Sequence, residues 1–156
     1  MEAEVLGIDH IYLAVRDLEV SDRFYRRALG EVLGFRRNAF TLAGDPHIQF
    51  FNRHFGVVLR PARGPEAPSG GAGLHHLCFR VEGAAEVERV AAGLQRAGIE
   101  ATAPRLYPEY APDYVATFFA DPDGIRLEVT NFRAERRRRQ ANWEDPGGDD
   151  TGADSR

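Results

Sequence analysis

The chain has 156 residues, of which 43% are hydrophobic, and a formal net charge of −4. This length predicts one compact domain or two small modules that share one sheet. The negative charge gives no reason to expect a nucleic-acid partner, and no apolar run approaches the roughly 20 residues of a membrane span. The N-terminus shows no signal segment, and the single cysteine, Cys78, excludes an internal disulfide, so we expect a cytoplasmic protein.

The first half of the chain predicts a strand, a helix and three further strands. Residues 9–15 alternate enough, with β-branched and aromatic side chains, to form a strand. Asp17 suits the cap of a helix that runs to about Leu29, because apolar residues recur at helical spacing, and Gly30 is expected to end it. The three further strands are expected at about 34–40, 47–52 and 56–60.

The second half starts the same pattern again. Residues 62–73 are rich in Pro, Gly, Ala and Ser and predict a linker. A strand is expected at 74–81, followed by a helix at 84–97 that Gly98 closes. The remaining strands are expected at about 99–106, 114–119 and 124–132.

The two halves therefore repeat one β-α-β-β-β pattern. With a period of about 66 residues, His10 falls on His76, and the apolar positions of the two opening strands coincide. The two closing strands coincide through their leading glycines, which places Arg60 on Glu128. The expected fold class is α+β, with two tandem βαβββ modules. Its parts are a first module at 1–61, the linker at 62–73 and a second module at 74–133.

Residues 134–156 have a different character. Four consecutive arginines at 136–139 precede an acidic, glycine-rich stretch from Glu144 onward. We expect this Arg-rich and then acidic segment to be a disordered tail. A solvated helix end is favoured over phosphate binding as the role of the arginines.

Strand parity gathers three potential metal ligands on one surface. Side chains two residues apart share a face of a strand, so His10 lies opposite the apolar face of the first strand. His76 takes the same face in the matching strand. In the last strand Leu127 faces the helices, so Glu128 points the other way.

Two imidazoles and one carboxylate form a facial triad, which leaves coordination positions open for water or substrate. These ligand types suit one divalent ion of Fe, Mn, Ni, Co or Zn. The competing interpretation is that each residue is a satisfied polar group at a strand end. Three such residues at repeat-related positions favour the metal site.

The chain resembles the vicinal oxygen chelate superfamily, which includes glyoxalase I, extradiol dioxygenases, methylmalonyl-CoA epimerase, fosfomycin-resistance thiol transferases and bleomycin-binding proteins. The resemblance covers residues 7 to about 132. It rests on Asp9-His10-Ile11, Ser21, Phe24-Tyr25, Leu29-Gly30, His76-Leu77-Cys78-Phe79, Phe119-Ala120-Asp121-Pro122-Asp123-Gly124 and Leu127-Glu128. It implies that the modules form a curled mixed sheet around a metal held by His10, His76 and Glu128.

Departures from the patterns of individual members narrow the choice among the activities of this superfamily. Arg60 stands where glyoxalase I has a fourth ligand, and a guanidinium cannot ligate a metal. Extradiol enzymes carry a tyrosine in the register of Phe118, although Tyr114 shares its parity. Fosfomycin enzymes have a small hydroxyl residue at Tyr12 and use a lysine, which this chain lacks. Bleomycin-binding relatives usually lack the triad that is complete here.

Arginines supply the positive charge of the expected pocket, because all 20 basic residues are arginine. Arg60 suits a substrate carboxylate or phosphate; an ion pair with Glu128, or exposure to solvent, is the alternative. Arg80 and Arg126 add positive charge unless they pair with carboxylates, and Phe118 is expected to contact substrate. We therefore expect a small, anionic or oxygen-rich substrate.

The resemblance implies that the metal chelates two neighbouring oxygens and stabilises an enolate-like intermediate. We predict a metal-dependent lyase or isomerase, with proton transfer by metal-bound hydroxide, Tyr12 or Tyr114. The alternatives are an Fe(II) extradiol-type dioxygenase and a non-catalytic binding protein of the antibiotic-resistance type. Family members complete the site within one chain or across a dimer, and we expect a homodimer because pairing buries sheet edges.

Overall fold

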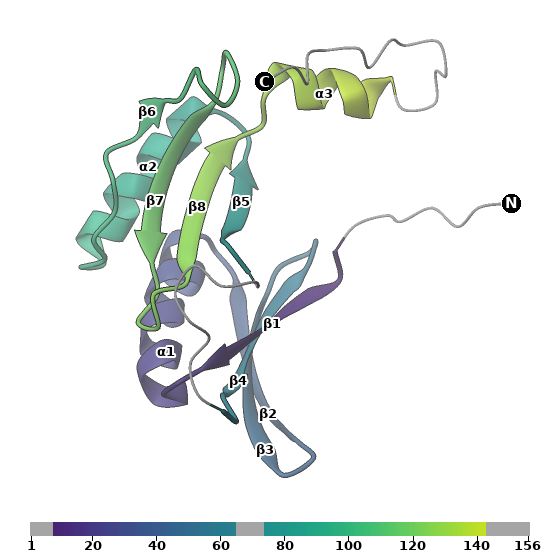
Figure 1. The fold of residues 1–156 in the computed structure, drawn as a ribbon, viewed down its shortest axis with the longest axis vertical. Helices are drawn as coiled ribbons and strands as arrows, with labels where there is room; N and C mark the ends of the chain where they lie inside the picture. The colour runs from purple at the N-terminus through teal and green to yellow at the C-terminus, as the bar shows by residue number, and fades with distance from the viewer. Residues whose placement is uncertain (1–7, 65–73, 143–156) are drawn as a thin grey trace, which may run out of the picture.

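The computed structural model describes residues 8–64 and 74–142, so the expected linker residues 65–73 and tail residues 143–156 lie outside it. Figure 1 shows two modules of similar build and a terminal helix. The first module consists of β1 (His10–Val15), α1 (Leu18–Tyr25), the π-helical η1 (Arg26–Val32), β2 (Arg36–Leu42), β3 (Asp45–Phe51) and β4 (Gly56–Pro61). The second consists of β5 (Leu77–Val81), α2 (Ala84–Arg96), β6 (Arg105–Leu106), β7 (Val115–Ala120) and β8 (Arg126–Asn131), before α3 (Ala134–Ala141).

Each module forms one four-stranded mixed sheet. The strand orders are β1-β4-β3-β2 and β5-β8-β7-β6, and the first and last strands of each module pair in parallel. The other neighbours in each sheet are antiparallel. This confirms the α+β class and the two tandem βαβββ units.

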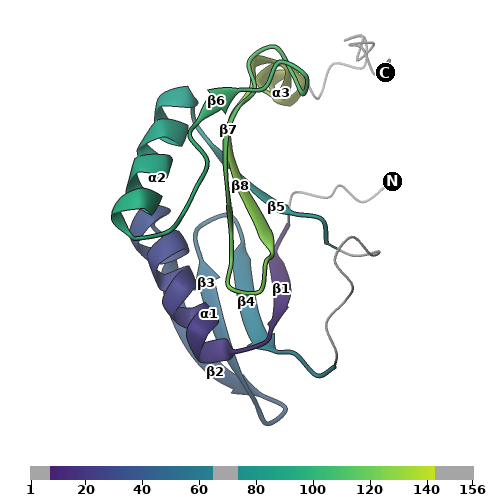
Figure 2. The same ribbon diagram turned by 60° about the vertical axis from the view of Figure 1, so that its left-hand side comes forward.

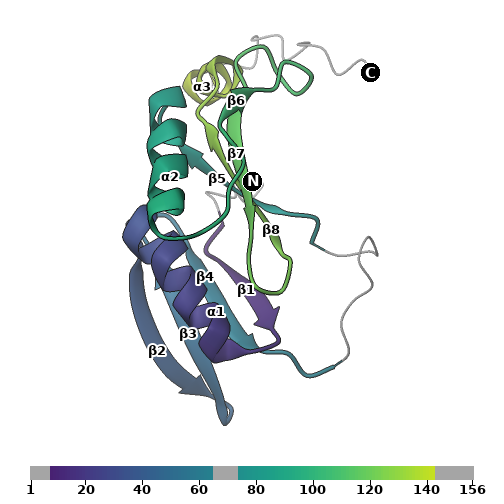
Figure 3. The ribbon, with the colours of Figure 1, turned by 90° about the vertical axis from the view of Figure 1, so that its left-hand side faces the viewer.

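Helices α1 and α2 lie on the same side of the two sheets, which leaves the opposite side uncovered by them (Figure 2). A quarter-turn view gives the same arrangement, with α2 stacked beyond α1 (Figure 3). Alternate side chains of each strand therefore point either to the side that carries the helices, the helix side, or to the opposite side, which we call the open face. The open face carries Tyr12, Arg60, Cys78 and Glu128, among others. No helix in the described ranges is long and apolar enough to cross a membrane.

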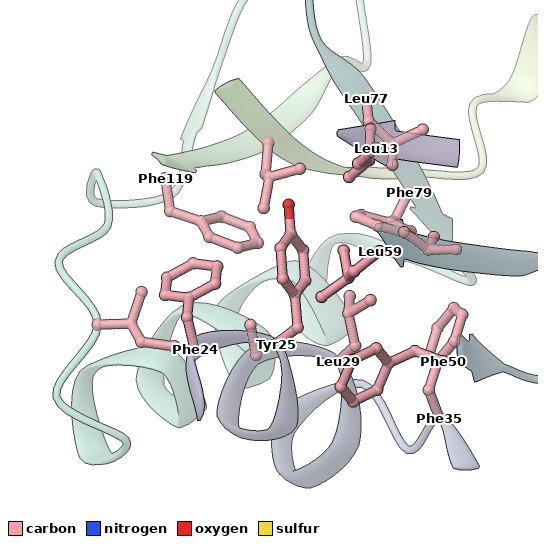
Figure 4. Close-up of a cluster of buried hydrophobic side chains, with 14 of the residues drawn as sticks. Leu13, Phe24, Tyr25, Leu29, Phe35, Phe50, Leu59, Leu77, Phe79 and Phe119 are labelled. Carbon is pink, nitrogen blue, oxygen red and sulfur yellow. The ribbon is translucent and has the colours of Figure 1, made fainter. Parts of the chain in front are cut away.

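One hydrophobic core serves both modules. Leu13, Leu29 and Phe50 of the first module belong to the same buried cluster as Leu77 and Phe119 of the second (Figure 4). Such a shared core buries more apolar surface than either small module could bury by itself. The two repeats therefore form one domain.

A buried hydrogen bond joins the modules at the edge of this core. The hydroxyl of Tyr25, at the end of α1, donates to Asp121 Oδ2 at 2.9 Å. The other oxygen of Asp121 accepts from the backbone N–H groups of Asp123 and Ile125, which shapes the turn before β8. Burial is the first cause that raises the pKa values of both Tyr25 and Asp121. The first helix is thus tied to the turn that leads into the Glu128 strand.

The first helix begins as predicted but continues further. Asp17 caps it by accepting from Val20 N at 2.9 Å. Gly30 does not end the helix, because the chain continues as a π-helix to Val32. A Cβ on Gly93 of α2 would lie 3.0 Å from Val32, so the extra turn packs closely on the second module. The change of direction comes at Gly34 instead, with φ of +70°.

Two other segments differ from the prediction. Within 99–106 only Arg105–Leu106 forms a strand, because Pro104 lacks the N–H that a ladder requires. The expected disordered tail is wrong for Ala134–Ala141, which forms α3, and the four arginines lie on this helix in agreement with the helix end favoured for them. There Asp113 accepts from Ala134 N, and Arg139 pairs with Glu135 one turn away, which stabilises the first turns.

The central parallel pairs of the two modules correct the predicted match between the closing strands. Tyr12 lies opposite Val58 in β1 and β4, whereas Cys78 lies opposite Glu128 in β5 and β8. Since Tyr12 and Cys78 match in the repeat, Val58 holds the place of Glu128, and the predicted match with Arg60 is wrong by two residues. A shift of two residues keeps every side chain on its face, so parity alone could not detect it.

Replacing Tyr25 with Phe tests the connection between the modules. The variant leaves the buried Asp121 carboxyl without its tyrosine donor, so we expect a loss of about 1–3 kcal/mol in the free energy of unfolding. Urea denaturation measures this loss. Tyr110→Phe is the matched control, because Tyr110 is 57% exposed and its hydroxyl makes no hydrogen bond with the described residues. Equal stability of the two variants would contradict this role for Tyr25.

Candidate metal centre

Two of the three predicted ligands meet on the open face of the second module. Glu128 lies on β8, and its side chain is 4% exposed. His76 lies directly before β5, and its Nε2 is 3.2 Å from Glu128 Oε2. A nitrogen and a carboxylate oxygen at this separation are the donor types that divalent transition metals take from proteins.

Tyr114 and Cys78 complete the surroundings of Glu128. The Tyr114 hydroxyl donates to Glu128 Oε1 at 2.5 Å. Burial first, and then this contact with Glu128, raise the pKa of Tyr114 well above its ordinary value, so it remains a proton donor at neutral pH. Burial of the thiol and the negative charge of Glu128 raise the pKa of Cys78 to about 12. Cys78 is therefore a neutral thiol, although its residue borders the open face.

His75 contributes to this group in a way that parity did not predict. Its Nδ1 is 2.8 Å from Nδ1 of His76, and the two rings meet edge to face. Both histidines precede the first residue of β5, so strand alternation does not govern them. One Nδ1 must donate and the other accept, so His75 orients the ring whose Nε2 faces Glu128.

The third predicted ligand, His10, lies elsewhere in the chain. Its Nδ1 is 2.5 Å from Asp9 Oδ1, and its ring lies against Tyr12 with centroids 5.4 Å apart. Across residues 8–64 and 74–142, no three His, Cys, Asp or Glu side chains are grouped closely enough to hold a metal. A single chain thus brings together His76 and Glu128 without His10.

The predicted substrate residues occupy both modules. Arg60 lies 3.5 Å from Asp45 Oδ2, so the alternative of an ion pair with Glu128 is wrong and its carboxylate partner belongs to the first module. The guanidinium of Arg126 lies 4.5 Å from the ring centre of Phe118, on adjacent strands of the open face. Arg80 lies in the same way over the ring of Phe132, at 4.1 Å. No carboxylate of the described residues forms an ion pair with Arg80 or Arg126, which leaves their charge to the open face.

His47 of β3 was not among the predicted site residues. Its side chain faces the same side as Tyr12, and the two rings lie 5.8 Å apart. The alternation of His47, Gln49 and Phe51 with the buried Ile48 and Phe50 was the signal that could have identified it.

Comparison with known proteins identifies the family of the chain. The model of the Glyoxalase/Bleomycin resistance protein/Dioxygenase superfamily matches residues 7–129. The chain is 32% identical over 131 residues to the uncharacterized protein YaeR of Escherichia coli K12, covering 78% of this chain and 93% of that one.

Solved structures give the same result for the fold. A glyoxylase/bleomycin resistance protein/dioxygenase domain from Frankia sp. EAN1pec superposes with a TM-score of 0.67 at 26% identity, covering 83% of this chain and all of that one. A lactoylglutathione lyase from Agrobacterium tumefaciens superposes with a TM-score of 0.58 at 21% identity, covering 84% and 96% of the two chains. At that identity the second likeness concerns the fold alone.

The raised pKa of Cys78 predicts a thiol of low reactivity that depends on Glu128. At pH 8, in protein dialysed against a chelator, iodoacetamide should alkylate Cys78 far more slowly than the unfolded chain, since about 1 thiol in 10⁴ is ionised four units below its pKa. Glu128→Gln removes the neighbouring negative charge and should accelerate alkylation several-fold. Glu100→Gln, on the exposed surface, should leave the rate unchanged. A Glu128→Gln rate no faster than wild type would contradict the electrostatic explanation.

Proposed function

We propose that this chain, which belongs to the Glyoxalase/Bleomycin resistance protein/Dioxygenase superfamily, is a metal-dependent enzyme. One divalent ion would be held by His76 and Glu128 together with His10 of the partner subunit. The observation that carries this proposal is the 3.2 Å approach of His76 Nε2 to Glu128 Oε2 on the open face.

The environment of Glu128 fits a cation. A buried carboxylate is costly unless a positive charge or several donors compensate it. Among the described residues, no arginine pairs with Glu128, and its contacts are His76, the Tyr114 hydroxyl and the neutral thiol of Cys78. The position of His75 behind His76 is typical of a group that orients a ligating imidazole.

The bound ion would act as a Lewis acid where negative charge develops on the substrate. Tyr114 keeps its proton and holds the Glu128 carboxylate in place, so it is a positioning residue. Tyr12, which is 43% exposed beside His10, is the group we assign to proton transfer. Arg126 and Arg80 would attract an anionic substrate to the open face. A proton-transfer group beside a Lewis acid on a positively charged face favours lyase or isomerase chemistry on a small, oxygen-rich acid.

The proposed dimer explains why His10 lies apart from the other two ligands. β1 and β5 each occupy an edge of their sheet, and open edges favour pairing with another chain. A cavity of about 760 Å³ adjoins both strands, and its lining combines core residues such as Leu77 and Phe79 with polar residues such as His54 and Arg80. A second copy that covers this region would pair the open strand edges and bring its own His10 to the site.

Two other functions of the family give different results in the same experiments. An extradiol-type dioxygenase would require Fe(II) and consume oxygen with catechols, although Phe118 offers no hydroxyl where those enzymes carry a tyrosine. A non-catalytic binding protein would bind its ligand without metal and without turnover.

Elemental analysis of protein purified without chelator tests the metal centre. We expect close to one divalent ion per chain in wild type and a loss of tenfold or more in metal affinity in His76→Ala or Glu128→Gln, because each removes a ligand. Glu100→Gln is the control, since Glu100 is an exposed carboxylate in the loop after α2. Metal-free wild-type protein, or variants that retain the ion, would overturn the proposal.

Mixing two inactive variants tests whether the site is shared. His10→Ala and His76→Ala each lack a ligand, but a heterodimer would combine His10 of one chain with His76 and Glu128 of the other. After joint refolding at equal amounts, about a quarter of the wild-type sites should be restored, because half of the dimers are mixed and each has one complete site. Metal content and turnover measure this recovery. No recovery, from variants that dimerise normally, would place all the ligands within one chain.

A further inference from the structure

A row of side chains crosses the open face of the first module at some distance from the proposed metal ligands. Ala14 lies opposite Arg60 in β1 and β4, and Phe40 lies opposite His47 in β2 and β3. The register that places Ile48 opposite Leu59 brings His47 and Arg60 together one step further along. The row therefore runs Ala14, Arg60, His47 and Phe40.

His47 is held in one orientation, and its neutral ring in one tautomer. Its Nδ1 is 3.0 Å from the carbonyl oxygen of Asp45. A carbonyl oxygen only accepts hydrogen bonds, so Nδ1 carries the proton and the neutral ring keeps its lone pair on Nε2. The ring stacks on Phe40 with centroids 5.2 Å apart, and Tyr12 meets it edge to face. Only 5% of the residue is exposed, so the ring cannot turn freely.

Two polar atoms in this row have no hydrogen-bond partner in the part of the chain that the structure describes. Nε2 of His47 makes no hydrogen bond with the described residues. The unpaired polar atoms that are fully enclosed do not include it, so it is accessible to solvent. Nε of Arg60 is enclosed and has no hydrogen-bond partner. The Arg60 side chain as a whole is 30% exposed, so its terminal nitrogens remain accessible to a bound anion.

The charge around this pair is positive. Asp45 is the carboxylate that contacts both Arg60 and Arg63. One negative charge therefore faces two positive charges, and an anion can be added without leaving a surplus of negative charge. Asp45 also supplies the carbonyl that fixes His47, so one residue positions both the acceptor and the donor of the row.

We propose that His47 and Arg60 form a recognition subsite for a hydroxyl adjacent to an anionic group, such as a 2-hydroxycarboxylate or a hydroxyalkyl phosphate. Nε2 of His47 accepts the hydrogen bond of the hydroxyl, and the Arg60 guanidinium binds the carboxylate or phosphate oxygens. His10, Tyr12 and His47 form a continuous series of ring contacts, so the subsite continues the same face toward the proposed metal centre. The inference rests on the proposed function only in taking this face as the substrate side.

The simplest probes are L-lactate and propionate, which share a carboxylate and differ in the hydroxyl. Binding is followed through the imidazole nitrogen signals of the full chain, both as purified and after dialysis against a chelator. In wild type, lactate should bind about two- to tenfold more tightly than propionate and shift the Nε2 signal of His47. Glycerol phosphate and inorganic phosphate form the second pair and distinguish a phosphate substrate from a carboxylate one.

Two substitutions of His47 separate recognition from structure. His47→Asn retains a donor at the Nδ1 position and loses Nε2, whereas His47→Gln places its amide near the Nε2 position. We expect His47→Asn to bind lactate and propionate equally and His47→Gln to retain part of the preference. Arg60→Gln should weaken both acids about tenfold, because it removes a charged donor. Arg96→Gln, an exposed residue of α2, should change nothing.

Several outcomes would overturn the subsite. Equal binding of lactate and propionate by wild type is one, and a His47→Asn variant that keeps the full preference is another. A preference that disappears with the chelator would assign the hydroxyl to a metal. Metal content measured on the same samples separates the two proposals, because His47→Asn and Arg60→Gln leave His10, His76 and Glu128 intact. Thermal unfolding of each variant verifies that it is folded.

Discussion

The shared core between the two modules is the constraint on which the rest of the structure depends. Neither four-stranded sheet has enough apolar surface to be stable with one helix alone, so the helix sides of both sheets close over a common interior. The hydrogen bond from Tyr25 to Asp121 lies at this junction and is buried with it. Because both helix sides face inward, both open faces are left for other contacts.

The chemistry of the chain follows from this arrangement. Side chains that alternate with the core residues have no packing role on the open face, so polar and charged groups can collect there. In the second module they surround a buried carboxylate, and in the first they surround a fixed imidazole and an unpaired guanidinium nitrogen. The two sheets thus carry different functional groups on one scaffold.

Much of this could be predicted from the sequence. Alternating apolar residues and the repeated histidine indicate the strands, the duplication and the face of each candidate ligand, all of which are local properties. The end of the first helix could not be predicted in this way, since it depends on the fit of Val32 against Gly93, far away in the chain. The partner of Arg60 is also set by tertiary structure. His75 contacts its neighbour His76 before β5 begins, where strand alternation makes no prediction.

Equivalent strand positions carry different side chains in the two modules, and this has a consequence for how such proteins diversify. Tyr12 pairs with Val58 in one module, whereas the equivalent Cys78 pairs with the buried carboxylate of Glu128 in the other. These positions alternate with the residues of the shared core, so they can change without a change in the helix side of the sheet. A duplicated module can therefore gain or lose a ligand by single substitutions, and selection can explore new active-site geometries while the interior stays the same.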